Sequence, residues 1–224
     1  MALHHFPRIV TDGLVLCLDA GNPLSYTSGD SVWRDLSGNG NNGTLVNSTF
    51  STSYNGSLYL NGSNTYVDFG KNVSNFNITS NATLSLWANV TLANAWRGFF
   101  GFASTSGYSA TAANFSVDFV TGTNQLRVWK NNTAFYGSII PITNTWYQYT
   151  IVSSNSGLEL YINETSAGSI GTTGNINSAQ YLVIGDNWDP NTTMFIAQCH
   201  LYNKTLSANE VSQNFNATKG RYGL

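Results

Sequence analysis

Apolar and polar residues alternate along most of this chain, which is the pattern of strands that bury one face. The clearest example reads Thr-Leu-Ser-Leu-Trp-Ala-Asn-Val from Thr83 onward and places four apolar side chains on one face: Leu84, Leu86, Ala88 and Val90. Comparable segments recur at intervals of roughly 8–12 residues with turn-forming residues between them, which predicts an all-β sandwich or barrel. They cover residues 14–19, 57–60, 66–69, 97–103, 115–120, 125–130, 134–140, 146–153, 158–163, 181–185 and 194–202. Helical crossovers are missing from the pattern, which excludes a parallel α/β sheet.

Two pairs of neighbouring segments are predicted to form hairpins. Residues 57–60 and 66–69 flank the turn sequence Asn-Gly-Ser-Asn, and residues 146–153 and 158–163 flank Ser-Asn-Ser-Gly. Both connections consist of residues that favour turns, with a glycine where positive φ is needed.

One helix is predicted, at the C-terminal end. Ser207 followed three residues later by Glu210 forms a capping box, and Gly220 is expected to end the helix in the left-handed conformation. No linker or change in composition divides the chain. We therefore expect one domain over residues 12–224, preceded by an N-terminal arm of residues 1–11 that lies outside the strand pattern.

The composition restricts the classes of partner. Charged residues are only 9% of the chain, against 42% hydrophobic residues, so Asn, Ser and Thr must supply most of the polar surface. The net charge of −2 argues against nucleic-acid binding. The apolar runs are too short to span a membrane, and the first residues lack the apolar core of a secretory signal.

Two cysteines, Cys17 and Cys199, lie in the first and last of the long predicted strands. This number is too small for a disulfide framework. A disulfide between adjacent strands requires restrictive geometry, so two buried free thiols are the main expectation and a single disulfide is the alternative.

A loop rich in glycine and asparagine follows the first strand. It reads Trp-Arg-Asp-Leu-Ser-Gly-Asn-Gly-Asn-Asn-Gly-Thr-Leu from Trp33 to Leu45. Glycine and asparagine accept positive φ, so the loop is expected to fold tightly. Its carbonyls, the Asp35 carboxylate and the amides of Asn39 and Asn41 are also ligands that suit Ca²⁺. A Ca²⁺ site and a purely structural turn both remain open at this point.

These segments, taken in order, resemble the laminin-G-like branch of the concanavalin A-like lectin/glucanase superfamily. The matching strings include Gly-Leu-Val-Leu-Cys-Leu-Asp-Ala from Gly13, Thr-Leu-Ser-Leu-Trp from Thr83, Leu-Glu-Leu-Tyr-Ile-Asn from Leu158 and Leu-Tyr-Asn-Lys-Thr-Leu-Ser from Leu201. The resemblance implies two packed antiparallel sheets in a jelly roll, with the first and last strands adjacent. The amino-acid sequences of the glycine-rich loop and of the C-terminal helix resemble those found in structural proteins of tailed bacteriophages, especially marine ones.

Glucanases of this superfamily place their catalytic carboxylates on one strand in a Glu-x-Asp-x-(x)-Glu pattern. The three glutamates of this chain, Glu159, Glu164 and Glu210, do not form that pattern, so we expect no enzymatic activity.

Candidate carbohydrate-binding residues combine an exposed aromatic ring, which stacks on a sugar, with amides and carboxylates for its hydroxyl groups. Trp188 is flanked by Asp186, Asn187 and Asp189, and Trp96 lies in a second predicted loop. Trp129 shares a strand face with Arg127, which favours exposure. The alternative for each tryptophan is a core or rim position, which we also expect for Trp33, Trp87 and Trp146.

Together these features predict a non-enzymatic bacteriophage virion surface protein, either a head decoration or a fibre component, assembled in the host cytoplasm. The expected partners are other virion proteins and host surface glycans, and a homo-oligomer or symmetric array is expected on the particle. The alternative is a stand-alone carbohydrate-binding module of a cellular protein.

Overall fold

The computed structural model describes residues 8–62, 64–91, 97–103, 115–120, 122–131, 133–171, 175–176, 181–186 and 193–224. Within these ranges, the side chains of Arg97, Phe99, Ala103 and Asp186 are not described. No helix in the described ranges has the length and hydropathy needed to cross a bilayer.

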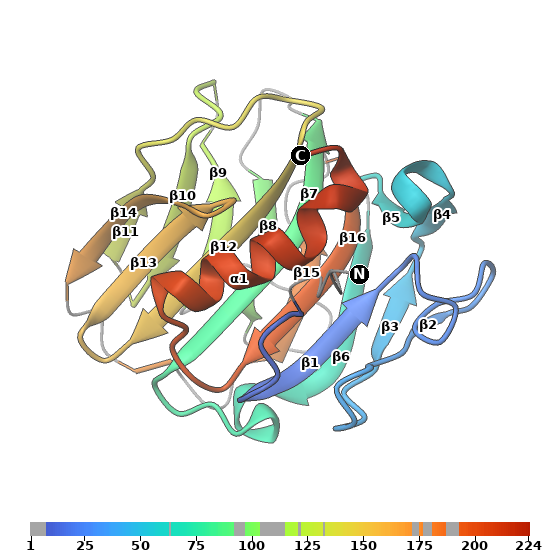
Figure 1. Cartoon of the computed structure of the whole chain (residues 1–224), viewed down its shortest axis with the longest axis horizontal. Helices are drawn as coiled ribbons and strands as arrows, with labels where there is room; N and C mark the ends of the chain where they lie inside the picture. Colours follow the sequence, from blue (N-terminus) through green and yellow to red (C-terminus); the bar gives the residue numbers. More distant parts are fainter. Residues whose placement is uncertain are drawn as a thin grey trace, which may run out of the picture.

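The strands of the described ranges form two antiparallel eight-stranded sheets that stack into a sandwich (Figure 1). The back sheet has the order β14 (Thr165–Gly171), β13 (Gly157–Ile162), β12 (Trp146–Ser154), β7 (Ala82–Thr91), β16 (Thr193–Tyr202), β5 (Ser57–Leu60) and β4 (Thr49–Ser51), with β1 (Leu14–Asp19) beside β16. The front sheet has the order β11 (Thr133–Tyr136), β10 (Leu126–Lys130), β9 (Phe115–Phe119), β8 (Arg97–Ala103), β15 (Tyr181–Asp186), β6 (Thr65–Asn72), β3 (Gly43–Val46) and β2 (Val32–Trp33). The helices within the described ranges are η1 (Ser53–Asn55), η2 (Val73–Phe76), α1 (Ala208–Thr218) and η4 (Lys219–Tyr222).

The predicted all-β, two-sheet antiparallel sandwich with a short C-terminal helix is confirmed. The first and last long strands, β1 and β16, are antiparallel neighbours, as expected. The alternation does not predict β14, because its sequence Thr-Ser-Ala-Gly-Ser-Ile-Gly carries few apolar residues.

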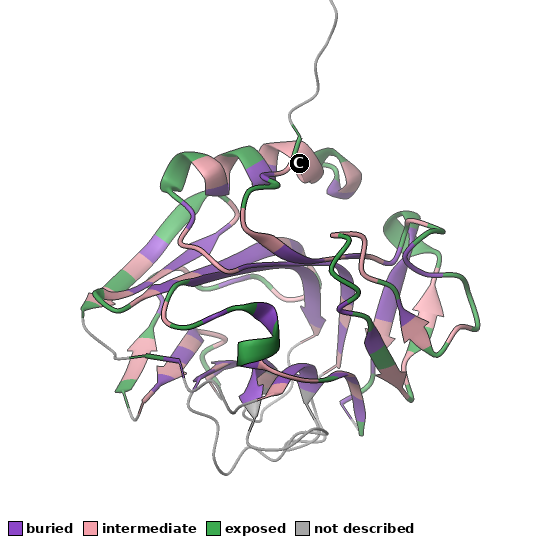
Figure 2. Cartoon of the chain, turned by 90° about the horizontal axis from the view of Figure 1, so that it is seen from below, coloured by how far each residue is buried: buried purple, intermediate pink, exposed green. Residues whose placement is uncertain are grey.

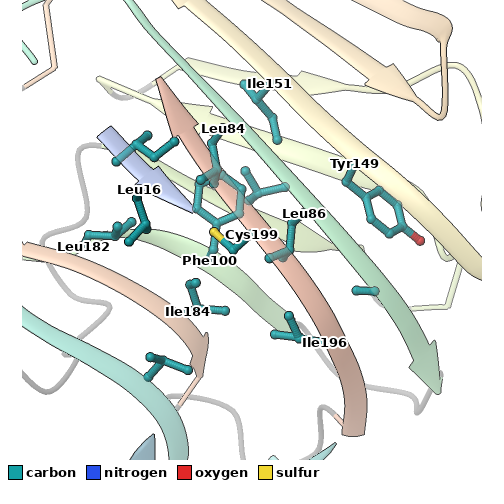
Figure 3. Packing of buried hydrophobic residues seen from close by; sticks show 14 of the residues in the cluster. Leu16, Leu84, Leu86, Phe100, Tyr149, Ile151, Leu182, Ile184, Ile196 and Cys199 are labelled. Carbon is teal, nitrogen blue, oxygen red and sulfur yellow. The ribbon is translucent and has the colours of Figure 1, made fainter. Parts of the chain in front are cut away.

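The core lies between the two sheets and is filled by inward-facing side chains of both (Figure 3). Leu84 and Leu86 of β7 belong to the same buried cluster as Phe100 of β8 and Ile184 of β15. Burying each such side chain contributes about 1.5–3 kcal/mol, so this cluster is the main stabilising element. Trp33 also belongs to it, as predicted.

Residues 57–69 do not form the predicted hairpin. β5 pairs with β4 and β16 of the back sheet, whereas β6 pairs with β3 and β15 of the front sheet. Leu60 and Val67 are both buried in the core between the sheets, so the chain passes from one sheet to the other between β5 and β6. The second predicted hairpin, β12 with β13, is confirmed.

Helix α1 lies on the outer face of the back sheet (Figure 2). Its capping box is confirmed: the Glu210 N–H donates to Ser207 Oγ (3.3 Å), and the Ser207 N–H donates to Glu210 Oε2 (2.8 Å). Gly220 does not end the helix. The chain continues into η4, and Gly223 takes the left-handed conformation instead, at φ 77°.

Aromatic stacking explains this longer helical segment. The extra turn brings the Tyr222 ring onto Trp87 of β7, with 3.9 Å between ring centroids. The Phe215 ring stacks on the same indole at 5.8 Å, and Trp87 Nε1 donates to Thr218 Oγ1 (2.8 Å). Trp87 and Trp146 are therefore buried, as predicted, but beneath the helix and not between the sheets.

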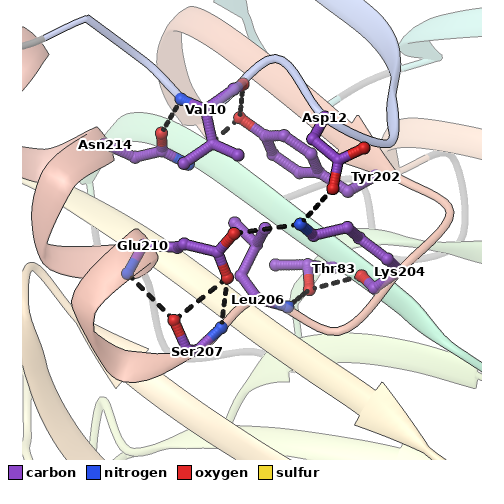
Figure 4. A network of polar contacts seen from close by, with 9 residues as sticks. All are labelled: Val10, Asp12, Thr83, Tyr202, Lys204, Leu206, Ser207, Glu210 and Asn214. Atoms are coloured by element: carbon purple, nitrogen blue, oxygen red, sulfur yellow. Dashed lines mark hydrogen bonds and ion pairs between the residues drawn. The ribbon is translucent and has the colours of Figure 1, made fainter.

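The described end of the N-terminal arm lies along α1 (Figure 4). The Val10 N–H donates to Asn214 Oδ1 (2.8 Å), and the Val10 carbonyl accepts from the Tyr202 hydroxyl (3.0 Å). Gln213 Nε2 donates to the Arg8 carbonyl (2.7 Å). These contacts attach residues 8–10 to the helix and to β16.

Both cysteines are free thiols, as expected, although Cys17 is only partly buried. Cys199 belongs to the core, whereas Cys17 pairs with His200 on the other face of the back sheet. Because successive strand residues point to opposite faces, the two sulfur atoms lie on different sides of the sheet. This placement explains why they do not form a disulfide.

One lysine lies inside the sandwich. Lys130, at the end of β10, is 1% exposed, and its Nζ donates to Ser153 Oγ of β12 (2.7 Å). Burial lowers the pKa of Lys130 from 10.5 to about 8.

Candidate functional site

The outer face of the front sheet carries a row of polar and aromatic side chains across β9, β10 and β11. Val117 and Val128 point into the core, so the alternate residues of these strands point outward. The register places Asp118, Arg127 and Tyr136 side by side on three adjacent strands. Three consecutive strands thus form one surface, which we call the front-sheet face.

The centre of the front-sheet face is a bidentate ion pair. Arg127 Nε and Nη2 donate to the two Asp118 carboxylate oxygens at 2.8 and 2.6 Å. Burial raises the pKa of Asp118, although the hydrogen bonds and charge of Arg127 act in the opposite direction. For Arg127, burial lowers the pKa, but the contacts with Asp118 and Tyr136 outweigh it and the pKa rises. The paired groups are held in one geometry, and their charges cancel.

Trp129 lies beside this ion pair. The Arg127 guanidinium carbon is 5.6 Å from the centroid of the Trp129 ring, within the range of a cation–π contact. Its neighbours across the strands are the small residues Ser116 and Ala134. The indole is half-buried and shares a face with Arg127, as the alternation predicts. Its role in binding sugar stays a prediction.

The other predicted sugar-binding residues lie at the limits of the described chain. Asp186 ends β15 and pairs with Thr65 of β6, but its side chain is not described. Trp96, Asn187, Trp188 and Asp189 lie outside the described residues. Their proposed roles therefore stay predictions.

The Asp35 carboxylate, the first predicted metal ligand, holds its own loop together. Its Oδ1 accepts from the N–H groups of Cys17 (2.9 Å) and Ser37 (2.8 Å). Its Oδ2 accepts from the Ser37 hydroxyl (2.7 Å) and the Asn41 N–H (2.9 Å). Each oxygen thus already accepts two hydrogen bonds, and the loop is joined to β1 through Cys17.

The two asparagines predicted as ligands also make protein contacts. Asn39 Nδ2 donates to the Leu14 carbonyl (3.3 Å), and Asn41 Nδ2 donates to the Val15 carbonyl (2.7 Å). Lys71 Nζ donates to Asn41 Oδ1 (2.7 Å) and to the Gly40 carbonyl (3.0 Å). A Ca²⁺ ion on these oxygens would compete with the Lys71 ammonium. In the described ranges no group of three His, Cys, Asp or Glu side chains forms a metal cluster, and a Ca²⁺ site and a purely structural loop stay alternative predictions.

Three titratable groups of β1 and β16 have pKa values shifted by burial. Burial lowers the pKa of His200 to about 4, so the imidazole is neutral. Burial and the nearby Asp35 raise the pKa of Cys17 to about 12, and burial raises the pKa of Cys199 as well. Neither thiol is therefore a thiolate at neutral pH.

Comparison with known families decides the classification. Residues 61–212, more than half of the chain, match the family model described as the Concanavalin A-like lectin/glucanases superfamily, a laminin-G-type domain. The chain belongs to this family. The resemblance in the sequence is thereby confirmed at the level of the superfamily, and the chain is a lectin-like jelly-roll domain.

Solved structures share the fold of this lectin-like domain. The sialidase of Trypanosoma rangeli superposes with a TM-score of 0.72 at 15% identity, covering 93% of this chain and 33% of the sialidase. The binding domain of Paraclostridial Mosquitocidal Protein 1 gives 0.72 at 19% identity, covering 92% of this chain and 52% of that domain. The receptor binding domain of botulinum neurotoxin C/D mosaic serotype gives 0.70 at 16% identity, covering 93% and 52%. The lectin-like domain thus spans between a third and about half of these structures. A search of curated proteins finds no relative.

The ion pair of the front-sheet face is the feature that sequence reasoning misses. An acidic residue in one strand and an arginine in the next would signal it. The pair is recognised only once the β9–β10 register sets Asp118 opposite Arg127.

Proposed function

We propose that this lectin-like domain is a non-enzymatic binding domain that holds a glycan on the front-sheet face. The observation that carries the proposal is the Trp129 indole beside the fixed Arg127–Asp118 pair. An indole offers a flat apolar surface for the C–H groups of a sugar ring, and neighbouring polar groups fix its orientation. Domains with the same fold in two toxins are named as binding domains, which supports this reading.

The charge of the front-sheet face favours neutral glycans. The Arg127 guanidinium is neutralised by Asp118 at 2.6 Å, so it offers little net attraction to an acidic sugar. The same pair supports a non-catalytic role. Glycosidases generally need two carboxyl groups about 5–9.5 Å apart, one of which donates a proton, whereas the Asp118 carboxylate is engaged by Arg127.

We further propose that the domain is displayed on a bacteriophage particle, in contact with other virion proteins and with host surface polysaccharide. Two features support this proposal. The sequences of the Asp35 loop and of the C-terminal helix resemble those of bacteriophage structural proteins, and only 9% of the residues are charged. Mass spectrometry and immunogold labelling of purified virions test this placement. Detection on the head or the fibre supports this placement. Absence from the virions, with the domain found only in a cellular protein, favours a stand-alone carbohydrate-binding module.

A glycan array that includes bacterial surface polysaccharides tests the binding site itself. Trp129→Ala is expected to weaken binding at least about tenfold, or about 1.4 kcal/mol, as for a central aromatic anchor. Tyr59→Ala is the matched control, because Tyr59 is a half-buried aromatic on the back sheet that packs on Phe195 at 4.9 Å. Trp129→Phe keeps an aromatic ring and should retain part of the affinity. If the wild type binds no glycan, or if Trp129→Ala binds normally, the proposal is wrong.

A further inference from the structure

A groove of about 650 Å³ opens on the back sheet at the β12–β13 hairpin, on the opposite sheet from the front-sheet face. The hairpin lies beside the first turn of α1 in Figure 1. The lining of the groove is mixed: Asn81, Glu159, Ser169 and Thr205 are among the polar residues, and Val152 and Ile170 are among the apolar ones. Its volume falls in the range of small-ligand sites, roughly 300–1,000 Å³.

Strand register explains the hollow. Val152, Glu159 and Ser169 form one row across β12, β13 and β14. In the neighbouring row Gly157 pairs with Gly171, so two adjacent positions have no side chain. A Cβ at Gly157 would lie 2.4 Å from the Ile170 carbonyl oxygen, whereas a Cβ at Gly171 would meet nothing within 4 Å. The paired glycines therefore leave an open depression in the outer face of the back sheet, one row away from Glu159.

Hydrogen bonds hold both sides of the groove in place. At the hairpin, Ser154 Oγ lies 2.9 Å from Ser156 Oγ and accepts from the Ser156 N–H (3.2 Å). At the other side, Thr83 Oγ1 donates to the Lys204 carbonyl (2.9 Å) and accepts from the Leu206 N–H (2.9 Å), as Figure 4 shows. These two bonds fix the backbone on either side of Thr205. The groove is thus preformed, which lowers the entropic cost of binding.

Glu159 is a positioned acceptor within this groove. Its Oε1 accepts from the Ser166 hydroxyl (3.0 Å). The side chains of Asn81 and Ser169 make no hydrogen bond to another described residue. Hydroxyls and an amide both donate and accept, and the carboxylate accepts only. Among the described residues that line the groove there is no lysine, arginine or aromatic ring, which disfavours an acidic or aromatic ligand.

We infer that this groove is a second saccharide-binding site, for a neutral, hydroxyl-rich oligosaccharide. A sugar hydroxyl donates to Glu159, and its neighbours exchange hydrogen bonds with Asn81, Ser169 and Thr205. The inference is independent of the front-sheet face, because the two sites share no residue. A domain with both sites binds two glycan segments from opposite sheets.

The test is an amide NMR titration of the full chain with neutral trisaccharides (maltotriose, cellotriose, mannotriose and laminaritriose) and with tri-galacturonic acid as the charged probe. At about 10 mM, ten times a weak Kd of about 1 mM, at least one neutral probe should shift the amides of residues 156–159 and 169–171. Tri-galacturonic acid should not shift them, because Glu159 repels a carboxylate.

Two variants make the assignment specific. Gly171→Gln places a side chain in the depression and should abolish the shifts, and Glu159→Gln should weaken binding at least about tenfold. Gly220→Gln is the matched control, because a Cβ there also meets nothing within 4 Å. Trp129→Ala should leave the groove shifts unchanged, which separates this inference from the front-sheet proposal. Absence of groove shifts with every neutral probe, or their persistence in Gly171→Gln, would overturn it.

Discussion

The buried ammonium of Lys130 predicts that Lys130→Met stabilises the domain at neutral pH. The side chain is 1% exposed, and among the described residues its hydrogen-bond partners are the Ser153 hydroxyl at 2.7 Å and the Ser154 carbonyl at 3.4 Å. No salt bridge to a described carboxylate compensates the charge. Methionine has a similar length and volume, so it should fill the same space without overpacking.

The expected magnitude follows from the pKa of Lys130, which burial lowers from 10.5 to about 8. At about 1.4 kcal/mol per pH unit, keeping the proton in the folded state at pH 7 costs about 3 kcal/mol. The variant leaves the Ser153 hydroxyl without its partner, which costs about 1–2 kcal/mol. The net gain in the free energy of unfolding is therefore about 1–2 kcal/mol at pH 7.

The way the stability gain of Lys130→Met changes with pH shows whether the buried charge causes it. The folded pKa lies below the unfolded one, so between pH 8 and 10.5 the unfolded chain binds more protons and this lysine's destabilising effect fades as pH rises. The advantage of Lys130→Met should therefore shrink by about 2 kcal/mol between about pH 7 and about pH 9.5. Burial raises the pKa of Cys17 to about 12, so this thiol lowers the free energy of unfolding as pH rises. The effect is the same in wild type and in Lys130→Met, so it cancels in the comparison.

Urea denaturation of wild type and variant at the two pH values measures this difference. Lys219→Met is the control, since Lys219 lies over the Phe215 ring on the surface of the helical segment and not in the core. A variant less stable than wild type at pH 7, or one whose advantage does not change with pH, would refute the reasoning.

Three further predictions concern other parts of the domain. Ser207→Ala removes the N-cap and should cost about 1 kcal/mol, measured as a melting temperature lower by about 2–4 °C. Ca²⁺ or a chelator should leave the melting temperature of the wild type unchanged, because Lys71 already bonds the loop oxygens; a rise with Ca²⁺ would show instead that the ion displaces it. Gly43→Ala should cost about 1–3 kcal/mol in urea denaturation, because its Cβ would lie 2.4 Å from a Val67 methyl carbon, whereas Gly220→Ala should be within about 0.5 kcal/mol of wild type.

Features that depend on neighbouring residues could be predicted from the sequence. The strands follow from period-two alternation, and the helix start follows from Ser207 and Glu210, which are three residues apart. The β5–β6 connection could not be predicted in this way. An apolar strand on each side of an Asn-Gly turn fits a hairpin and a passage between sheets equally well, because both bury Leu60 and Val67.

The candidate sites depend on contacts between residues of different strands and loops. Alternation places Trp129 on the same face as Arg127, but the partner Asp118 is found only from the register of two strands. Lys71 reaches Asn41 from a strand 30 residues away, which the loop sequence cannot show. The back-sheet groove requires Gly157 and Gly171 to be paired, and the irregular register of β13 and β14 is not visible in the sequence.

The packing of residues 8–10 against α1 has a practical consequence for the orientation of the domain. Gln213 holds the Arg8 carbonyl, and η4 leads from the same helix to Leu224, so both described ends of the chain lie over the back sheet. A tether fixed at either end would leave the front sheet pointing away from its support. On an immobilised sample, Trp129 would thus face the solution, while the groove lined by Glu159 would face the support. Ligand binding in the groove would therefore depend on the length of the tether, whereas binding at Trp129 would not.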